Sequence, residues 1–354
     1  MKRLGGLWSA LTSWDNLLLA YRKARRGKRS RPEVARYSCH LEPELLQLQQ
    51  ELLQGSYQPG MYRQFTIYDR KPRIISAAPF RDRVVHHAIM NLIEPALDKR
   101  FIEDCYACRK GKGVHAAVNR YQAYAQQYAY VLKLDIQKYF PTVDHALLKH
   151  RLCCRIKDPQ TLNLLDLIID ASPESPAPFD LFAGDDLFTA LERRRGIPIG
   201  NLTSQFFANL YLDDFDHWLK ETLRVPAYLR YVDDLILLDN DKQRLWAYCQ
   251  QISDYLLTCR LRLHERKRQI FRTTEWVDVL GYRISRTRRL LRNDNGYRFR
   301  RKLNRLAQAY AEHRVDWKDL NPSVQSWIGH ARHAETEGLR TKLFYGVVFQ
   351  RAHT

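Results

Sequence analysis

The sequence predicts an α+β fold in which an antiparallel sheet is combined with helices. Apolar and polar residues alternate over 130–136, and two apolar, strand-like runs flank a tight turn over 228–238. Other segments repeat apolar residues at helical spacing, and in one of them Phe299, Leu303, Leu306 and Tyr310 share a face. A hairpin, a further strand and connecting helical sequence together indicate the α+β class.

The turn of the 228–238 hairpin carries two adjacent carboxylates, Asp233 and Asp234. Asn-Gly or Asp-Gly would suit a tight turn better, so the demands of the turn do not explain the acids. Like charges this close repel each other unless a cation lies between them, and Mg²⁺ is the usual cation at such carboxylates. For this segment alone, an exposed acidic turn is the simpler alternative.

A second strand, 130–136, supplies a third carboxylate. The period of two places Leu132, Leu134 and Ile136 on one face of the sheet and Val131, Lys133 and Asp135 on the other. Nucleotidyl transfer uses carboxylates of this kind to hold two Mg²⁺ ions roughly 3.5–4 Å apart. An isolated Asp at a strand end would be an ordinary surface residue, but together with the acidic hairpin Asp135 indicates a catalytic metal site.

Between the two acidic segments lies a glycine-bracketed loop that leads into an apolar helix. Gly196 and Gly200 would let the backbone approach a ligand closely. Asn201 or Thr203 could cap a helix expected at 206–212. A loop that enters a helix is a favourable place for a phosphate or a nucleotide.

In these segments the chain resembles the reverse transcriptases. The Asp135 strand is similar to their first palm motif, 197–200 to their nucleotide-side loop and 231–234 to their catalytic hairpin. Further matches are the basic motif after the palm helix at 266–267, the primer-gripping hairpin at 280–284 and the bacterial fingers motifs at 71–75, 80–88 and 106–113. The resemblance runs in order from about Leu17 to the C-terminus.

The resemblance implies a right-hand polymerase fold with fingers, an antiparallel-sheet palm with helices, and a helical thumb. We expect an N-terminal extension and fingers over 1–114, a palm over 115–285 and a thumb with a C-terminal extension over 286–354. A Pro-, Ser- and Asp-rich insertion loop should interrupt the palm at about 171–186. Within the fingers we expect a helix at 41–53, strands at 65–68 and 73–76, and a long helix containing 84–97.

The resemblance also implies RNA-directed DNA polymerase activity, with dNTPs as substrates and with template RNA and a cDNA/RNA duplex as partners. Asp135 and Asp233 would hold two Mg²⁺ ions, for which Mn²⁺ could substitute, with Asp234 as an auxiliary ligand and Ile136 beside them. Lys267 is a candidate acid for the leaving pyrophosphate. Arg73 is a candidate triphosphate contact, and Phe140 is a candidate gate against the 2′-hydroxyl. Their alternatives are an exposed strand arginine and ordinary core packing. Further candidates are Ile199, Gly200 and Gln205 for the nucleotide, and Arg22, Lys23, Arg25, Arg26, Lys28, Tyr282, Arg300, Arg301 and Arg305 for nucleic acid.

Within the family, three strings resemble the reverse transcriptases of diversity-generating retroelements: 14–23, 200–205 and 326–334. This narrower resemblance implies copying of a template-repeat RNA with errors at template adenines, for targeted diversification of a variable gene (mutagenic retrohoming). It also implies a small, basic, oligomeric accessory variability protein as partner. Ile199 stands where many faithful relatives have a glutamine, so one polar contact to the nucleotide is lost. The alternatives are a retron-like or defence-associated reverse transcriptase, or a binding protein that kept a polymerase shape without activity, which the three acids argue against.

Charge and cysteine content agree with this interpretation. The net charge is +19 and the pI about 9.7, which favours a polyanionic partner, and seven basic residues lie between Arg22 and Arg31. No apolar stretch approaches the ~20 residues that span a bilayer, so we expect no membrane partner. Seven cysteines suit a reducing cytoplasm, and the resemblance implies that of a bacterium or a phage-infected bacterium. For the pairs Cys105/Cys108 and His330/His333, packing or surface positions are favoured over metal ligation.

Overall fold

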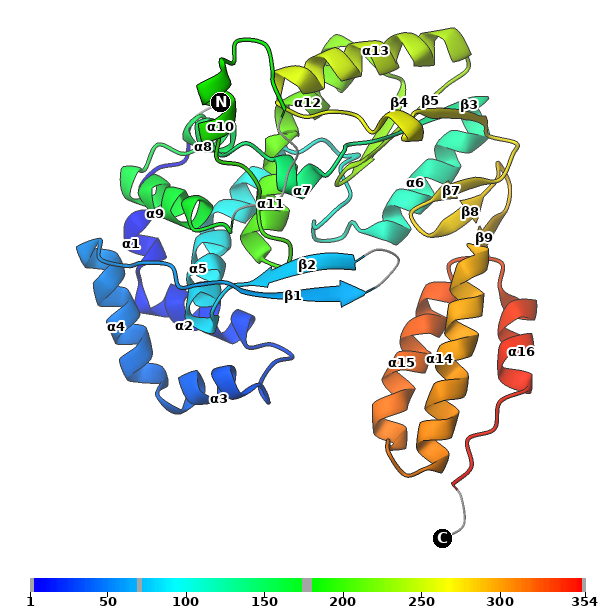
Figure 1. Cartoon of the computed structure of the whole chain (residues 1–354), viewed down its shortest axis with the longest axis horizontal. Coiled ribbons are helices and arrows are strands. Elements are labelled where there is room, and N and C mark those ends of the chain that lie inside the picture. Colours follow the sequence, from blue (N-terminus) through cyan, green and yellow to red (C-terminus); the bar gives the residue numbers. More distant parts are fainter. Residues whose placement is uncertain (1–2, 69–71, 174–179, 352–354) are drawn as a thin grey trace.

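A computed structural model describes residues 3–68, 72–173 and 180–351. The chain combines helices with three antiparallel sheets, which confirms the predicted α+β class (Figure 1). Helices of the N-terminal third lie around a β-hairpin, a four-stranded sheet with helices follows, and a separate group of helices forms the C-terminal end. None of the helices in the described ranges is both long and apolar enough to span a bilayer.

The N-terminal third is a helical layer packed on one long central helix. Its elements are α1 (Trp8–Leu11), α2 (Trp14–Ala24), α3 (Pro32–Cys39), α4 (Leu41–Gln54) and the central α5 (Phe80–Leu97), which η1 (Asp98–Arg100) follows. Ser13 caps α2 by accepting from the amide of Asn16, and Gly55 ends α4 in the left-handed conformation that glycine adopts at low cost. The helix expected at 41–53 and the long helix expected to contain 84–97 are both confirmed.

The central helix α5 buries a histidine whose ionisation should make folding sensitive to acid. His86 is 3% exposed, and burial lowers its pKa to about 3. The unfolded chain takes up a proton near pH 6.5, while the folded chain cannot do so until far lower pH. The free energy of unfolding should therefore fall as the pH drops below about 6.5, by up to about 1.4 kcal/mol per pH unit for this group. The free energy of unfolding, measured by urea denaturation at pH 7 and at pH 5, should differ less for His86→Gln than for the native chain. The same pH dependence in both proteins would contradict this assignment. His40→Gln, on an exposed residue, is the control.

The β-hairpin consists of β1 (Arg63–Tyr68) and β2 (Pro72–Ala77), paired antiparallel with Ile67 opposite Arg73. These strands match the expected segments. Lys71 of the fingers motif lies outside the described residues. β1 is exposed throughout, whereas β2 becomes buried toward its C-terminal end. The hairpin therefore rests on the rest of the molecule by one end, beside the loop that precedes α11 (Leu202–Tyr211).

The main sheet has the strand order β4–β5–β3–β6 and is antiparallel throughout. Its strands are β3 (Tyr130–Asp135), β4 (Ala227–Tyr231), β5 (Asp234–Asp239) and β6 (Gln269–Arg272). Leu132, Leu134 and Ile136 enter the larger core, whereas Val131 enters a second core on the opposite face. The predicted alternation is therefore correct, and each apolar face of the sheet is covered by helices.

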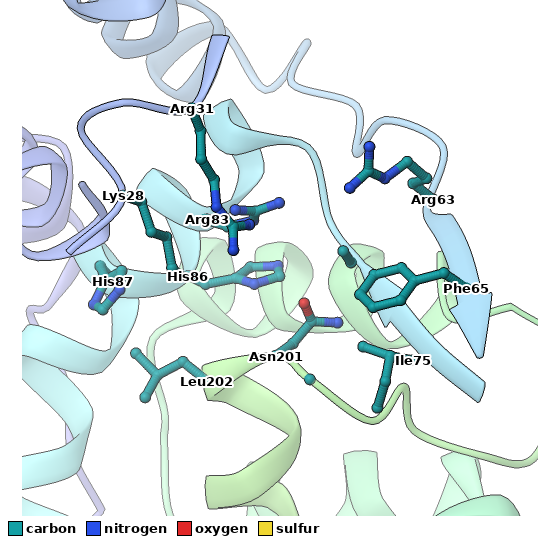
Figure 2. A pocket seen from close by; sticks show the side chains of 12 residues that line it. Lys28, Arg31, Arg63, Phe65, Ile75, Arg83, His86, His87, Asn201 and Leu202 are labelled. Atoms are coloured by element: carbon teal, nitrogen blue, oxygen red, sulfur yellow. The ribbon is translucent and has the colours of Figure 1, made fainter. Parts of the chain in front are cut away.

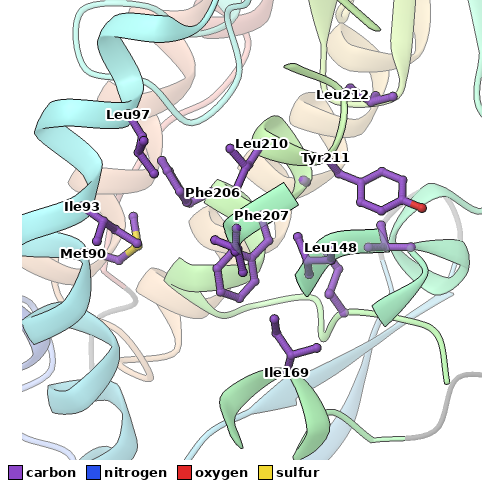
Figure 3. Packing of buried hydrophobic residues seen from close by; sticks show 14 of the residues in the cluster. Met90, Ile93, Leu97, Leu148, Ile169, Phe206, Phe207, Leu210, Tyr211 and Leu212 are labelled. Atoms are coloured by element: carbon purple, nitrogen blue, oxygen red, sulfur yellow. The ribbon is translucent and has the colours of Figure 1, made fainter. Parts of the chain in front are cut away.

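Helices cover both faces of this sheet. α6 (Val114–Gln127) belongs to the second core, and α13 (Lys242–Thr258) belongs to the larger one. α11 runs through the larger core, where Phe206 and Phe207 lie between side chains of α5 and α9 (Figure 3). The remaining elements here are α7 (Tyr139–Thr142), α8 (His145–Cys153), α9 (Pro159–Asp170), α10 (Leu187–Glu192), α12 (Asp213–His217), the π-helical η2 (Trp218–Thr222) and η3 (Glu265–Lys267).

Two predicted details differ in the structure. α11 begins at Leu202, four residues before the expected start, because Asn201 occupies the N-cap position. Its side chain does not cap the helix and instead bonds to Ser76 and Ala78 of the hairpin region. The expected insertion loop contains no helix or strand in its described part, while residues 174–179 lie outside the description.

The C-terminal end is a small sheet followed by helices. The strands β7 (Val277–Val279), β8 (Tyr282–Ile284) and β9 (Arg289–Leu291) are antiparallel, and α14 (Asn293–Ala311), α15 (Trp317–Ala331) and α16 (Glu337–Tyr345) follow. Phe299 of α14 stacks on Trp327 of α15 with ring centroids 4.0 Å apart. Arg300, Arg301 and Arg305 are exposed on α14, while Leu303 is fully buried. This helix thus has the apolar and basic sides that its sequence predicts.

Candidate active site

The acidic hairpin turns over two residues, Val232 and Asp233. β4 ends at Tyr231 and β5 begins at Asp234, so only the first of the two acids lies in the turn itself. Val232 has a φ of 56°, a left-handed conformation that is unusual for a β-branched residue. Such conformations cluster at functional sites and persist only where surrounding contacts hold them.

Those contacts come from a buried ion pair beneath the turn. Arg230 is fully buried and its guanidinium bonds to Asp216 of α12, with Nη2 2.6 Å from Oδ2. It also donates to the carbonyl oxygen of Val232 at 3.3 Å and to Asn209. The sequence prediction missed this support, although an arginine within the apolar run 227–231 was a usable signal. The pair fixes the strained turn to the helical layer behind it.

The three carboxylates meet where β3 and β5 run side by side. Asp135 is the register partner of Asp234, and the amide of Ile136 donates to the carbonyl oxygen of Asp233 at 3.1 Å. Opposed residues of an antiparallel pair have Cα atoms only about 4.5–5.5 Å apart. The sheet thus brings together acids that lie about a hundred residues apart in the chain.

The electrostatics of this cluster favour a bound cation. Burial and the neighbouring Asp233 raise the pKa of Asp234 to about 6. Burial likewise raises the pKa of Asp233, which Asp135 reinforces and Lys267 and Arg73 oppose. In the described part of the chain, no three His, Cys, Asp or Glu side chains are gathered into a ready-made metal cage. Instead the Lys267 ammonium lies 2.6 Å from Asp135 Oδ2 and balances part of the charge. At this site the carboxylates outnumber the paired cation, and carboxylate oxygens are the ligands that hard divalent cations such as Mg²⁺ prefer.

Predicted nucleotide contacts lie on the segments that flank these acids. The amide of Ile197 donates to the carbonyl oxygen of Phe140 at 2.9 Å, which joins the glycine-bracketed loop to the segment after β3. The carbonyl oxygen of Ile199 accepts from Ser76 of β2 at 3.0 Å. Gly200 has a φ of 115°, and a Cβ there would meet Ile75 Cγ2 at 2.8 Å, so only glycine fits. Phe140 is partly buried against Tyr139.

Two other predicted contacts are exposed. Arg73 lies on β2 close enough to influence the pKa of Asp233, and Gln205 lies on the first turns of α11. Both side chains are therefore accessible to a ligand. Backbone hydrogen bonds thus join the loop that carries Ile199 to Ser76 of β2 and to Phe140 of α7.

One predicted nucleic-acid contact is wrong. Tyr282 is fully buried in β8, and its hydroxyl donates to the carbonyl oxygen of His330 at 3.0 Å. It packs the sheet on α15 and has no surface to offer a strand. His330 and His333 serve the same packing, since the His333 ring stacks on His115 at 3.6 Å. Cys105 is buried and Cys108 is exposed, and both are free thiols.

The basic segment is largely folded rather than a separate arm. Arg22 and Lys23 lie in the last turn of α2, and the Lys23 ammonium donates to Asn91 of α5 at 2.6 Å. Arg25 bonds to the hydroxyl of Tyr21. Arg22, Lys23 and Arg26 are exposed, while Arg25 and Lys28 are partly buried. The helices therefore hold these charges at fixed positions on the surface.

Comparison with known proteins identifies the family. The profile of the family described as reverse transcriptase (RNA-dependent DNA polymerase) matches residues 67–284. The chain is 27% identical over 290 residues to protein YkfC of Escherichia coli K12, covering 71% of this chain and 73% of that protein. It is 26% identical over 87 residues to nuclear intron maturase 1 of Arabidopsis thaliana, covering 25% of this chain and 12% of that protein.

Solved structures of telomerase from Candida tropicalis are also similar. The apo enzyme matches with a TM-score of 0.49 and 13% identity over 67% of this chain and 49% of that one, and a C-terminally truncated form matches with 0.47 and 14% over 66% and 55%. The chain thus spans about half the length of the telomerase chains it matches. The profile covers more than half of this chain and contains all three acids, so the chain belongs to the reverse transcriptase (RNA-dependent DNA polymerase) family.

Proposed function

We propose that this protein is an RNA-directed DNA polymerase that copies template RNA into cDNA by two-metal nucleotidyl transfer. The observation that supports this most directly is the meeting of Asp135, Asp233 and Asp234 at the adjoining ends of β3 and β5. Its partners would be template RNA, the cDNA/RNA duplex and dNTPs. Primer extension on an RNA template by the purified protein tests the proposal, and absence of dNTP-dependent product with either Mg²⁺ or Mn²⁺ would refute it.

The residues of the site have different proposed roles, which follow from their positions. Asp135, Asp233 and Asp234 would hold two Mg²⁺ ions, which Mn²⁺ could replace, with Ile136 keeping its backbone beside them. When bound, these ions supply Lewis acidity toward the primer 3′-hydroxyl and the triphosphate. Arg73 approaches from β2 to bind the triphosphate. Lys267, whose ammonium pairs with Asp135, would give a proton to the leaving pyrophosphate.

Phe140 is proposed to exclude ribonucleotides. Its ring is only partly buried, and its carbonyl oxygen is bonded to the loop that carries Ile199. Phe140→Ala should open space beside the 2′ position and raise the ratio of ribonucleotide to deoxynucleotide incorporation about tenfold. Single-nucleotide extension with rNTPs and dNTPs measures that ratio. An unchanged ratio in a variant with native thermal stability would assign Phe140 to packing alone.

We further propose that the enzyme belongs to a diversity-generating retroelement and acts in the bacterial cytoplasm, or in a phage-infected bacterium. The strings at 14–23, 200–205 and 326–334 support this narrower assignment. The enzyme would then copy a template-repeat RNA with a small, basic, oligomeric accessory protein. A variable repeat paired with a template repeat in the neighbouring DNA would support this assignment. Their absence would favour a retron-like or defence-associated enzyme without adenine mutagenesis.

Ile199 provides a direct test of error-prone copying. Its side chain is partly buried in the loop between Gly196 and Gly200 and has no hydrogen-bonding group to offer the nucleotide. Ile199→Gln should restore a polar contact worth about 0.5–1.5 kcal/mol and lower adenine misincorporation several-fold relative to other template bases. Sequencing of cDNA made on a defined RNA measures this effect, with Ile199→Leu as the control. If the native enzyme copies adenine as accurately as the other bases, the assignment to this class fails.

A further inference from the structure

A basic pocket, which does not include the three carboxylates, lies between the N-terminal helices and the β1–β2 hairpin (Figure 2). It is a pocket of about 240 Å³ into which Lys28, Arg31, Arg63 and Arg83 converge. The loop after α2 supplies the first two, and β1 and α5 supply the others. Three of these four residues precede residue 67, where the match to the family profile begins. The remaining cation, Arg83, and the floor of the pocket lie within the matched segment.

The charge in this pocket is poorly balanced by the protein. Arg83 pairs with Glu33 at 3.2 Å, and its Nε donates to the carbonyl oxygen of Ala78. Within the described ranges, no carboxylate pairs with Lys28, Arg31 or Arg63. Burial and the neighbouring Arg83 and Arg31 lower the pKa of Lys28, and the single nearby carboxylate, Glu33, opposes this only in part. An anionic ligand would relieve this repulsion.

The floor of the pocket also favours an anion. α11 begins at the pocket-lining Leu202, and its N-cap residue Asn201 directs its side chain to the hairpin region. The first amides of the helix thus carry their partial positive charge without a side-chain cap. His86 is 3% exposed and its ring faces the pocket (Figure 2). Phe65, 41% exposed, adds an aromatic face at the rim, with Arg63 5.8 Å from its ring centroid.

The position of the pocket selects the kind of anion. β2 connects the two sites, because Arg73 acts on Asp233 while Ala77 of the same strand lines the pocket. Four residues of extended strand span roughly 13 Å. Arg73, the proposed triphosphate contact, does not line the pocket, so a triphosphate held at the carboxylates is a poor candidate to fill it. A single strand that passes along the hairpin would reach it within a few nucleotides and could stack a base on Phe65.

We propose that Lys28, Arg31 and Arg83 bind a backbone phosphate of the single-stranded RNA template shortly before the template reaches the carboxylates. The inference rests on the proposed polymerase function and identifies where the unpaired template is held. The pocket would grip the backbone without reading sequence, since its contacts are charges and amides rather than base edges. Gly200 and Asn201 also line the pocket, so the bound template would lie beside the loop that is proposed to contact the nucleotide.

The test uses the full chain and an RNA template annealed to a labelled DNA primer, with the 5′ overhang of the template lengthened one nucleotide at a time. For the native protein, fluorescence anisotropy should show affinity rising in a step once the overhang reaches the pocket. Lys28→Gln/Arg31→Gln should lose that step, weakening binding about tenfold on long overhangs and leaving the blunt duplex unaffected. The matched control Arg36→Gln/Lys242→Gln removes two exposed charges elsewhere and should keep the step.

Other outcomes would overturn the proposal. Equal weakening at every overhang length would show general electrostatic attraction, and an unchanged step would show that the pocket does not hold RNA. A raised KM for dNTP with the step intact would assign the pocket to the nucleotide triphosphate. Because anisotropy measures binding alone, a protein that shows the step but makes no cDNA would refute the polymerase function and leave the pocket standing.

Discussion

Asp233→Asn should reduce RNA-templated DNA synthesis by about 10³-fold or more while leaving the fold and RNA binding intact. The substitution keeps the size of the side chain but removes a charge from the point where three carboxylates meet. These carboxylates act most strongly on charge that develops in the transition state, so the loss should appear in kcat rather than in the affinity for template. Asp135→Asn should behave in the same way and should also release Lys267 from its ion pair.

Single-turnover primer extension and anisotropy on the same preparations separate rate from binding. Asp254→Asn, on an exposed residue of α13, is the matched control and should retain native activity. Near-native extension by either active-site variant would remove the carboxylate cluster from the mechanism. Loss of RNA binding in parallel with activity would instead indicate a folding defect.

Arg230→Leu should destabilise the protein by about 3–5 kcal/mol, because it leaves Asp216 buried without its partner. Both side chains are fully buried, so water cannot replace the lost ion pair. The carbonyl oxygen of Val232 would also lose a donor, and the strained turn beside Asp233 would lose its support. The rate of cDNA synthesis per folded molecule should therefore also fall, in addition to the loss of folded protein.

Urea denaturation measures the loss, and a double variant identifies its cause. Arg230→Leu/Asp216→Asn removes the stranded charge while keeping an acceptor for the hydroxyl of Tyr228, and should recover about half of the lost stability. Arg288→Leu, which breaks an exposed ion pair with Glu335, should change stability little. No recovery in the double variant would show that packing around Arg230, rather than charge, dominates the loss.

Local patterns in the sequence were sufficient to predict the strands that carry the candidate site and the first long helix of the C-terminal end. The alternation over 130–136 determined which side chains of β3 enter the larger core, and that placed Asp135 on the opposite face. The apolar runs around Asp233 and Asp234 required a hairpin. The apolar and basic spacing of 299–310 was enough to define α14 and the sides it presents. These predictions succeeded because side-chain direction in a strand or helix follows from its period alone.

The tertiary structure decided which distant residues act together. Lys267 pairs with Asp135, and Arg230 with Asp216, across stretches of chain that no local period connects. Tyr282 belongs to a recognisable segment, yet burial under α15 gives it a packing role instead of contact with nucleic acid. The basic pocket likewise exists only because the loop after α2 lies beside α5, which brings Lys28 and Arg83 together. Ion pairs and burial depend on distances in three dimensions, which a one-dimensional pattern does not contain.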